Sequence, residues 1–100
     1  MKIGFAQINP TVGDLSGNFE KILGAYERLA AAGAELVLTP ELAITGYPPQ
    51  DLLFKSRFVP QNLEVLEKLH AQVHGAGLLV GYVERNQGRG KPFQDRKSVV

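Results

Sequence analysis

Strand-like and helix-like segments alternate along this chain of 100 residues, and this alternation restricts its fold more than any other feature. Residues 3–8 and 35–39 form short apolar runs of the kind found in buried strands. The segment between them repeats apolar residues at the i, i+3, i+4 and i+7 spacing of a helix with one buried face. A strand–helix–strand step requires a crossover connection, which is typical of parallel strands. The sequence therefore predicts an α/β fold.

The first predicted helix covers residues 18–32. Asp14 or Ser16 can cap its beginning, because short oxygen-bearing side chains accept hydrogen bonds from free backbone N–H groups. Gly33 is the expected left-handed stop. The predicted buried stripe of this helix consists of Phe19, Ile22, Leu23, Tyr26, Leu29 and Ala30.

The second half of the chain repeats the pattern with a predicted helix over 60–75 and a strand over 78–83. Pro60 suits a first helical turn, where a missing N–H costs nothing. The stripe of the second helix consists of Leu63, Leu66, Leu69 and Val73. Residues 86–91 are rich in glycine and charge and predict a hairpin turn rather than a phosphate-binding loop, because the Gly-x-x-x-x-Gly-Lys-Ser/Thr pattern is incomplete.

Composition excludes several classes of function. The net charge is +1, which gives no electrostatic reason to expect nucleic acid or an anionic membrane as a partner. The chain has no cysteine, so it contains no disulfide, no thiolate metal site and no cysteine nucleophile. The lack of cysteine fits a cytoplasmic protein, and no signal peptide or membrane-length apolar run is evident. We expect one α/β unit, because the sequence shows no repeat, no low-complexity tract and no internal linker.

The segment 39–53 contains the strongest functional signal. It places Glu41 where an apolar strand ends and a loop rich in glycine and proline begins. Open α/β sheets bind ligands outside the carboxyl ends of their strands. A carboxylate held there beside apolar neighbours is a candidate general base with a raised pKa. The alternative is a loop glutamate that is simply solvated.

Several motifs accompany Glu41. They are Lys2–Pro10, Val12–Asp14 with Asn18, Pro40–Leu42, Thr45–Pro49, Asp51–Leu53, Gly81–Glu84 and Gly90–Pro92. Together they resemble the nitrilase (carbon–nitrogen hydrolase) superfamily, and within it the N-terminal glutaminase domains of the glutamine-dependent NAD synthetase family. The resemblance covers roughly residues 1–93.

The resemblance implies a fold and a reaction. The fold is the N-terminal portion of a nitrilase-like α-β-β-α sandwich, with residues 1–100 forming a partial domain that lacks its C-terminal portion. The reaction is hydrolysis of glutamine by a glutamate, a lysine and a cysteine. Glu41 matches the glutamate. Tyr47 resembles a tyrosine near the glutamine pocket, and the alternative is a tyrosine that only packs within the loop. The lysine and the cysteine lie further along in the family, so we expect the isolated chain to be inactive.

The resemblance also implies partners. Glutamine is the substrate of the complete domain, whose ammonia serves the amidation of deamido-NAD. A separate synthetase domain handles ATP and magnesium, and this segment is expected to bind no cofactor. We further expect a homo-oligomer, with no nucleic acid or membrane partner.

For the other polar residues, the sequence favours structural or surface roles over catalytic ones. Lys55 and Lys91 do not lie in the lysine motif of the family, and Asp51 is expected to cap a helical turn. His70 and His74 have the i, i+4 spacing of zinc ligands, but the glutamate of His-Glu-x-x-His is missing, which favours histidines on a solvated helix surface.

The C-terminal residues depart from the family pattern. Arg96 and Lys97 are adjacent, so in a strand one of them would face the core, where an unpaired charge is costly. We therefore expect either a fourth strand that begins near Ser98 or a tail that is not native-like.

Two further hypotheses concern the function of the chain. The chain can belong to a stand-alone amidase of the superfamily, or it can be a non-catalytic remnant that acts through an exposed sheet edge.

Overall fold

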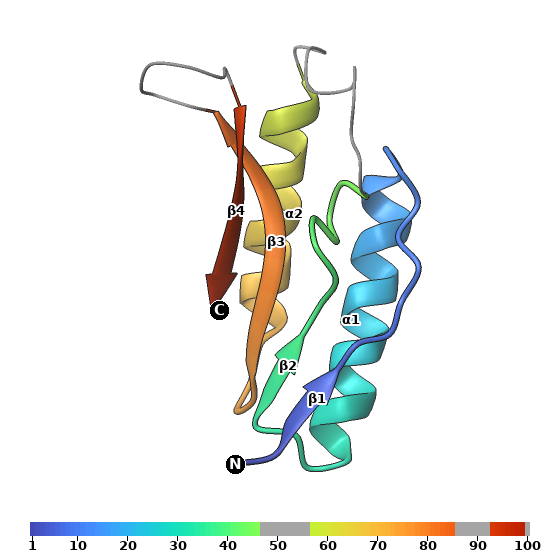
Figure 1. The fold of residues 1–100 in the computed structure, drawn as a ribbon, viewed down its shortest axis with the longest axis vertical. Coiled ribbons are helices and arrows are strands. Elements are labelled where there is room, and N and C mark those ends of the chain that lie inside the picture. Colours follow the sequence, from blue (N-terminus) through green and yellow to red (C-terminus); the bar gives the residue numbers. More distant parts are fainter. Residues whose placement is uncertain (47–56, 86–92, 100) are drawn as a thin grey trace.

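The computed structural model describes residues 1–46, 57–85 and 93–99 (Figure 1). The elements are β1 (Ile3–Phe5), α1 (Leu15–Ala31), β2 (Leu36–Leu38), α2 (Phe58–Gln72), β3 (Gly77–Arg85) and β4 (Phe93–Val99). The alternation of strands and helices predicted from the sequence is confirmed.

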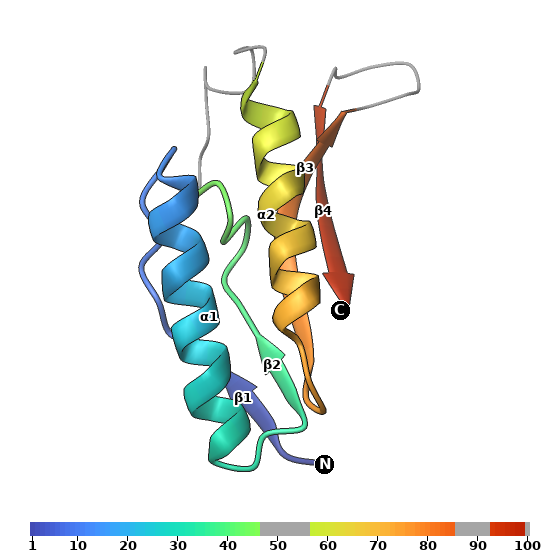
Figure 2. The same cartoon turned by 180° about the vertical axis from the view of Figure 1, so that it is seen from behind.

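The strands form one sheet in the order β1-β2-β3-β4. The first three strands are parallel, with Ile3 opposite Leu36 and Leu36 opposite Gly77. β4 pairs with β3 in the antiparallel direction. Both helices cross over on the same side of the sheet, so α1 and α2 form one layer against it (Figures 1 and 2). This arrangement brings the carboxyl ends of β1, β2 and β3 to one edge.

α1 begins earlier than the sequence suggested, at Leu15 rather than residue 18. Asp14 is its N-cap, and the carboxylate Oδ1 accepts a hydrogen bond from the backbone N–H of Gly17 at 3.1 Å. Ser16 lies inside the helix and is not the cap. The prediction of Asp14 as one of two candidate caps is therefore confirmed, and the predicted helix start was wrong by about one turn.

The end of α1 is set by Gly33, which has a φ of 101°. The N–H of Gly33 donates to Ala30 at 3.0 Å, and the N–H of Ala34 donates to Leu29 at 3.0 Å. These two bonds satisfy carbonyl groups that the helix end leaves free. The predicted left-handed stop at Gly33 is confirmed.

α2 runs from Phe58 to Gln72, which shifts both predicted ends toward the N-terminus. Pro60 lies in the first turn as predicted. His74 lies beyond the end of the helix, where the backbone at Val73 is already extended. The i, i+4 helical spacing of His70 and His74 therefore does not exist in the structure.

The core lies between the helix layer and the sheet. Its fully buried apolar side chains include Ile22, Val37, Leu69, Leu78 and Val80, and most of the predicted stripe residues that are only half-buried pack around them. The opposite face of the sheet carries the exposed side chains of Ile3 and Phe5 on β1. In the α-β-β-α sandwich that the resemblance implies, a second sheet would cover that face.

β4 differs from the prediction for the C-terminal residues. It extends from Phe93 to Val99 instead of beginning near Ser98, and its ladder with β3 runs from Leu79↔Val99 to Arg85↔Phe93. β4 pairs with one neighbour and forms an edge of the described sheet. Edge strands tolerate charged side chains, so the charges of this segment do not prevent pairing.

Candidate functional site

Glu41 lies at the carboxyl end of β2, in a turn that spans residues 41–45. Before the turn, the N–H of Thr39 donates to the carbonyl of Leu79 on β3 at 3.1 Å, and the hydroxyl Oγ1 of Thr39 donates to the same carbonyl at 3.0 Å. The side chain of Glu41 is exposed, whereas residues 42–46 are buried. The Glu41 carboxylate is therefore exposed on a turn whose other residues are buried.

The turn has an unusual backbone. Leu42 has a φ of 47°, a left-handed conformation that residues other than glycine seldom adopt. The side chain of Leu42 packs with Val59 and Leu63 of α2. The N–H of Gly46 closes the turn by donating to the Leu42 carbonyl at 2.8 Å. Burial of Leu42 and this hydrogen bond both stabilise a conformation that costs about 1 kcal/mol on its own.

The buried amide of Asn18 connects the Glu41 turn to the loop after β1. Its Nδ2 donates to the carbonyl of Ile44 at 2.8 Å and to the carbonyl of Thr11 at 2.8 Å. Its Oδ1 accepts from the N–H of Thr11 at 2.8 Å. In addition, the N–H of Gly13 donates to the carbonyl of Thr45 at 2.8 Å. The two loops at the carboxyl edge are therefore held together by α1.

A hollow of about 350 Å³ opens next to the Glu41 turn. It is lined by Phe5, Ala6, Gln7, Leu38, Thr39 and Pro40, which come from the carboxyl ends of β1 and β2 and the residues that follow them. Pro40 directly precedes Glu41. This is the position at which open α/β sheets bind ligands.

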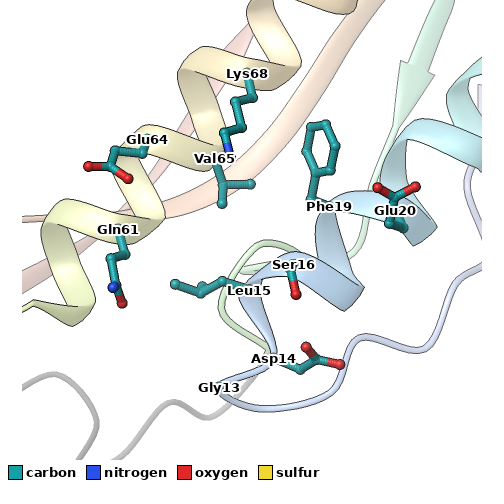
Figure 3. Close-up of a pocket in the computed structure, with 10 residues that line it drawn as sticks. All are labelled: Gly13, Asp14, Leu15, Ser16, Phe19, Glu20, Gln61, Glu64, Val65 and Lys68. Atoms are coloured by element: carbon teal, nitrogen blue, oxygen red, sulfur yellow. The ribbon is translucent and has the colours of Figure 1, made fainter.

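A larger hollow of about 520 Å³ lies elsewhere, between the N-terminal parts of α1 and α2 (Figure 3). Leu15, Phe19 and Val65 line its apolar part, while Glu64 and Lys68 contribute charge from α2 (Figure 3). Glu41 is not among its lining residues. Glu41 does not line the smaller hollow either, but Pro40, the residue directly before it, does, so we place the candidate site there.

Several predicted residues lie outside the described part of the chain. They are Tyr47, Asp51, Lys55 and Lys91, so their predicted roles stay predictions.

His70 and His74 are both exposed, and the backbone N–H of His74 donates to the hydroxyl of Tyr26 at 3.1 Å. Within 1–46 and 57–82, the structure brings no three His, Asp or Glu side chains together as metal ligands. No helix among the described residues is long and apolar enough to span a membrane.

The comparison with protein families decides the classification. The family model described as carbon-nitrogen hydrolase matches residues 2–96. The chain belongs to the carbon-nitrogen hydrolase family. Its sheet of three parallel strands and one antiparallel strand, covered by a layer of helices, agrees with the nitrilase-like fold of glutamine-dependent NAD(+) synthetases.

Named relatives make the similarity more specific. The chain is 48% identical to a glutamine-dependent NAD(+) synthetase of Synechocystis sp. over 82 residues, which cover 81% of this chain. It is 34% identical over 89 residues, or 87% of its length, to the enzyme of the same name from Thermotoga maritima. The matches cover 15% and 16% of those two relatives, so the chain spans a small part of their length.

One solved structure has the same name as these relatives and the same fold as this chain. The crystal structure of a glutamine-dependent NAD(+) synthetase from Cytophaga hutchinsonii superimposes with a TM-score of 0.88 at 28% sequence identity. The superposition covers 98% of this chain and 16% of that chain. The nitrilase-superfamily resemblance found in the motifs is therefore confirmed.

Proposed function

We propose that this chain is the N-terminal segment of the glutaminase domain of a glutamine-dependent NAD synthetase, with Glu41 as the general base. The observation that carries the proposal is the position of Glu41. It is an exposed carboxylate on a buried turn, at the carboxyl end of a parallel strand and beside a hollow. The similarity to relatives of that name supports the choice of substrate.

The proposed chemistry needs a nucleophile from outside these 100 residues, because the sequence contains no cysteine. A thiol becomes a strong nucleophile only after deprotonation, so it requires an adjacent base. Glu41 takes the thiol proton as sulfur attacks the carboxamide carbon of glutamine. A lysine, also outside this chain, stabilises the oxyanion that forms.

The second half of the reaction returns the proton. As the tetrahedral intermediate collapses, the carbon–nitrogen bond breaks and Glu41 gives its proton to the departing ammonia. The thioester that remains is then hydrolysed by water, which gives glutamate and the free thiol. The ammonia passes to a synthetase domain, where ATP and magnesium serve the amidation of deamido-NAD. Residues 1–100 contribute the base and the strand ends that hold it.

The test uses the full-length protein that contains this chain. NAD formation from deamido-NAD and ATP is measured with either glutamine or ammonium chloride as the nitrogen source. Glu41→Gln is expected to lower the glutamine-dependent rate by roughly 10²- to 10⁴-fold, the usual contribution of a general acid or base. The ammonia-dependent rate is expected to stay unchanged, because ammonia bypasses the glutaminase.

A matched control is Glu35→Gln. Glu35 is also an exposed glutamate, but it precedes β2, whereas Glu41 follows that strand. We expect this variant to keep both rates. An equal loss in the two variants would contradict the role of Glu41.

The wild-type protein tests the alternative functions. Glutamine hydrolysis by a wild-type protein that forms no NAD would favour a stand-alone amidase. Self-association without any activity would favour a non-catalytic remnant.

A further inference from the structure

The Glu41 turn lies directly against the backbone of β3 at Gly81. The N–H of Ile44 points to the carbonyl of Gly81 at 3.4 Å, so the chain returns to the strand after the turn. A Cβ atom at position 81 would lie 2.5 Å from the backbone nitrogen of Leu42, 3.0 Å from its Cα and 3.5 Å from the carbonyl carbon of Glu41. The first distance is far below ordinary van der Waals contact, which begins near 3.4 Å.

The obstacle at position 81 cannot be relieved by a rotamer change. The nearest atoms belong to the backbone of the turn, not to the end of a flexible side chain. Gly81 itself is buried in a strand that pairs with β4 on one side. Any larger residue at position 81 must therefore push the peptide between Glu41 and Leu42 away from the sheet.

The turn cannot move freely in response, because it is held from the opposite side. Asn18 of α1 binds the carbonyl of Ile44 at 2.8 Å. Gly46 at the end of the turn lies so close to Val12 that its own Cβ would be 2.6 Å from the Val12 Cα. The displacement would thus be concentrated at residues 41 and 42.

We propose that Gly81 is a positioning residue for Glu41. Its missing side chain sets how closely the turn approaches β3, and thereby sets where the carboxylate stands at the edge of the sheet. Asn18 fixes the same turn from α1. This inference rests on the proposed role of Glu41, and it assigns a part in the reaction to the backbone of β3 at Gly81.

The magnitude follows from the geometry. Restoring ordinary contact between a Cβ at position 81 and the nitrogen of Leu42 requires a shift of about 1 Å, and a misplacement of that size can lower a rate by about 10²-fold. We therefore expect Gly81→Ala to reduce glutamine-dependent NAD formation by roughly 10- to 100-fold, while ammonia-dependent formation stays within about two-fold of wild type.

The matched control is Gly24→Ala in α1. A Cβ at position 24 would meet only the guanidinium end of Arg28 at 3.4 Å. The substitution adds the same methyl group without touching any backbone, and alanine favours a helix over glycine. We expect this variant to keep both rates.

A double-mutant cycle separates positioning from simple destabilisation. If Gly81 acts through Glu41, then Gly81→Ala has little further effect in the Glu41→Gln protein, because the base is already gone. A merely structural role would lower the residual rate by the same factor in both backgrounds. The proposal would be overturned if Gly81→Ala lowered the rate by the same factor in the wild-type and Glu41→Gln backgrounds. It would also be overturned if Gly81→Ala kept wild-type glutamine-dependent activity.

The wild-type rate tells the two proposals apart. A full-length wild-type protein without glutamine-dependent NAD formation removes the proposed function itself. If the wild-type protein has that activity and Gly81→Ala behaves like Gly24→Ala, only the positioning role is refuted.

A second variant covers the case in which Gly81→Ala does not fold. Asn18→Ala then replaces it, and we expect it to lower the glutamine-dependent rate alone by several-fold. Failure of both variants to fold would mean that these residues are structural, which also overturns the proposal.

Discussion

The hydroxyl of Tyr26 connects α1 to the segment that leads into β3, and its removal is a precise test of the described packing. Tyr26 is 3% exposed. Its hydroxyl lies 2.6 Å from the carbonyl of Ala76 and 3.1 Å from the carbonyl of His74, and it accepts a hydrogen bond from the N–H of His74 at 3.1 Å. A hydroxyl has one proton, so the short contact to Ala76 is its main donation.

Tyr26→Phe keeps the ring and removes only the oxygen. The buried carbonyl of Ala76 and the N–H of His74 then lose their partner. A buried group left without a hydrogen bond costs about 1–3 kcal/mol, so we expect the segment 74–77 to lose about 1.5–3 kcal/mol of local stability. Because each 1.4 kcal/mol corresponds to a factor of ten, its amide hydrogens should exchange roughly 10- to 150-fold faster.

Hydrogen exchange measured by mass spectrometry on peptides that cover residues 74–77 checks this expectation. Tyr82→Phe is the matched control, since Tyr82 is a half-buried tyrosine of β3 whose hydroxyl bonds to no residue in the described part of the chain. We expect no acceleration in the control. An acceleration below about two-fold in Tyr26→Phe, or an equal one in Tyr82→Phe, would refute the reasoning from unpaired polar groups.

The remaining predictions concern the helix cap, the core and the open face. Asp14→Ala removes the bond to the Gly17 N–H and should lower the stability of the protein by about 1 kcal/mol in thermal unfolding. Ile22→Ala removes a side chain with no exposed surface and should cost about 2–5 kcal/mol in the same assay. The isolated 1–100 chain exposes 45% of Ile3 and 66% of Phe5. We expect it to self-associate in analytical ultracentrifugation, and the double replacement of these two residues by serine should shift it toward the monomer.

The parts of the fold that depend on local chemistry were predictable from the sequence. The 3.6-residue period identified α1, and Gly33 marked its end because a left-handed residue is needed there. Asp14 was one of two candidates for the cap, and only the structure could choose, since Ser16 has the same kind of oxygen. The parallel order of the first strands followed from the crossovers.

The parts that depend on long-range pairing were not predictable. β1 ends at Phe5 although the apolar run continues to Ile8, because only three of its residues find partners on β2. β4 begins at Phe93 because the backbone of β3 extends to Arg85 and offers it a ladder. Charge pattern alone argued against that strand, but backbone pairing at an edge outweighs it.

The site shows the same division between local and long-range information. Glu41 was a candidate from the sequence because a carboxylate followed an apolar strand, and its motif resembled that of a known family. The left-handed backbone of Leu42 and the contact with Gly81 gave no signal in the residue pattern. Asn18 did leave one signal: it lies four residues before the buried Ile22, so it places a polar amide on the apolar face of α1.

If Glu41 has the proposed role, the arrangement around it explains why this carboxylate is carried on a turn that is otherwise buried. A loop that only had to reach solvent would need no strained residue, no glycine contact and no buried amide. Here Thr39 and Ile44 fix the turn to β3 on one side, and Asn18 fixes it to α1 on the other. These anchors come from segments far apart in the sequence, so the position of the carboxylate is determined only when the sheet and the first helix have assembled. A base that must meet a nucleophile from another part of the protein requires that kind of fixed position, because small displacements of a reacting group lower the rate steeply.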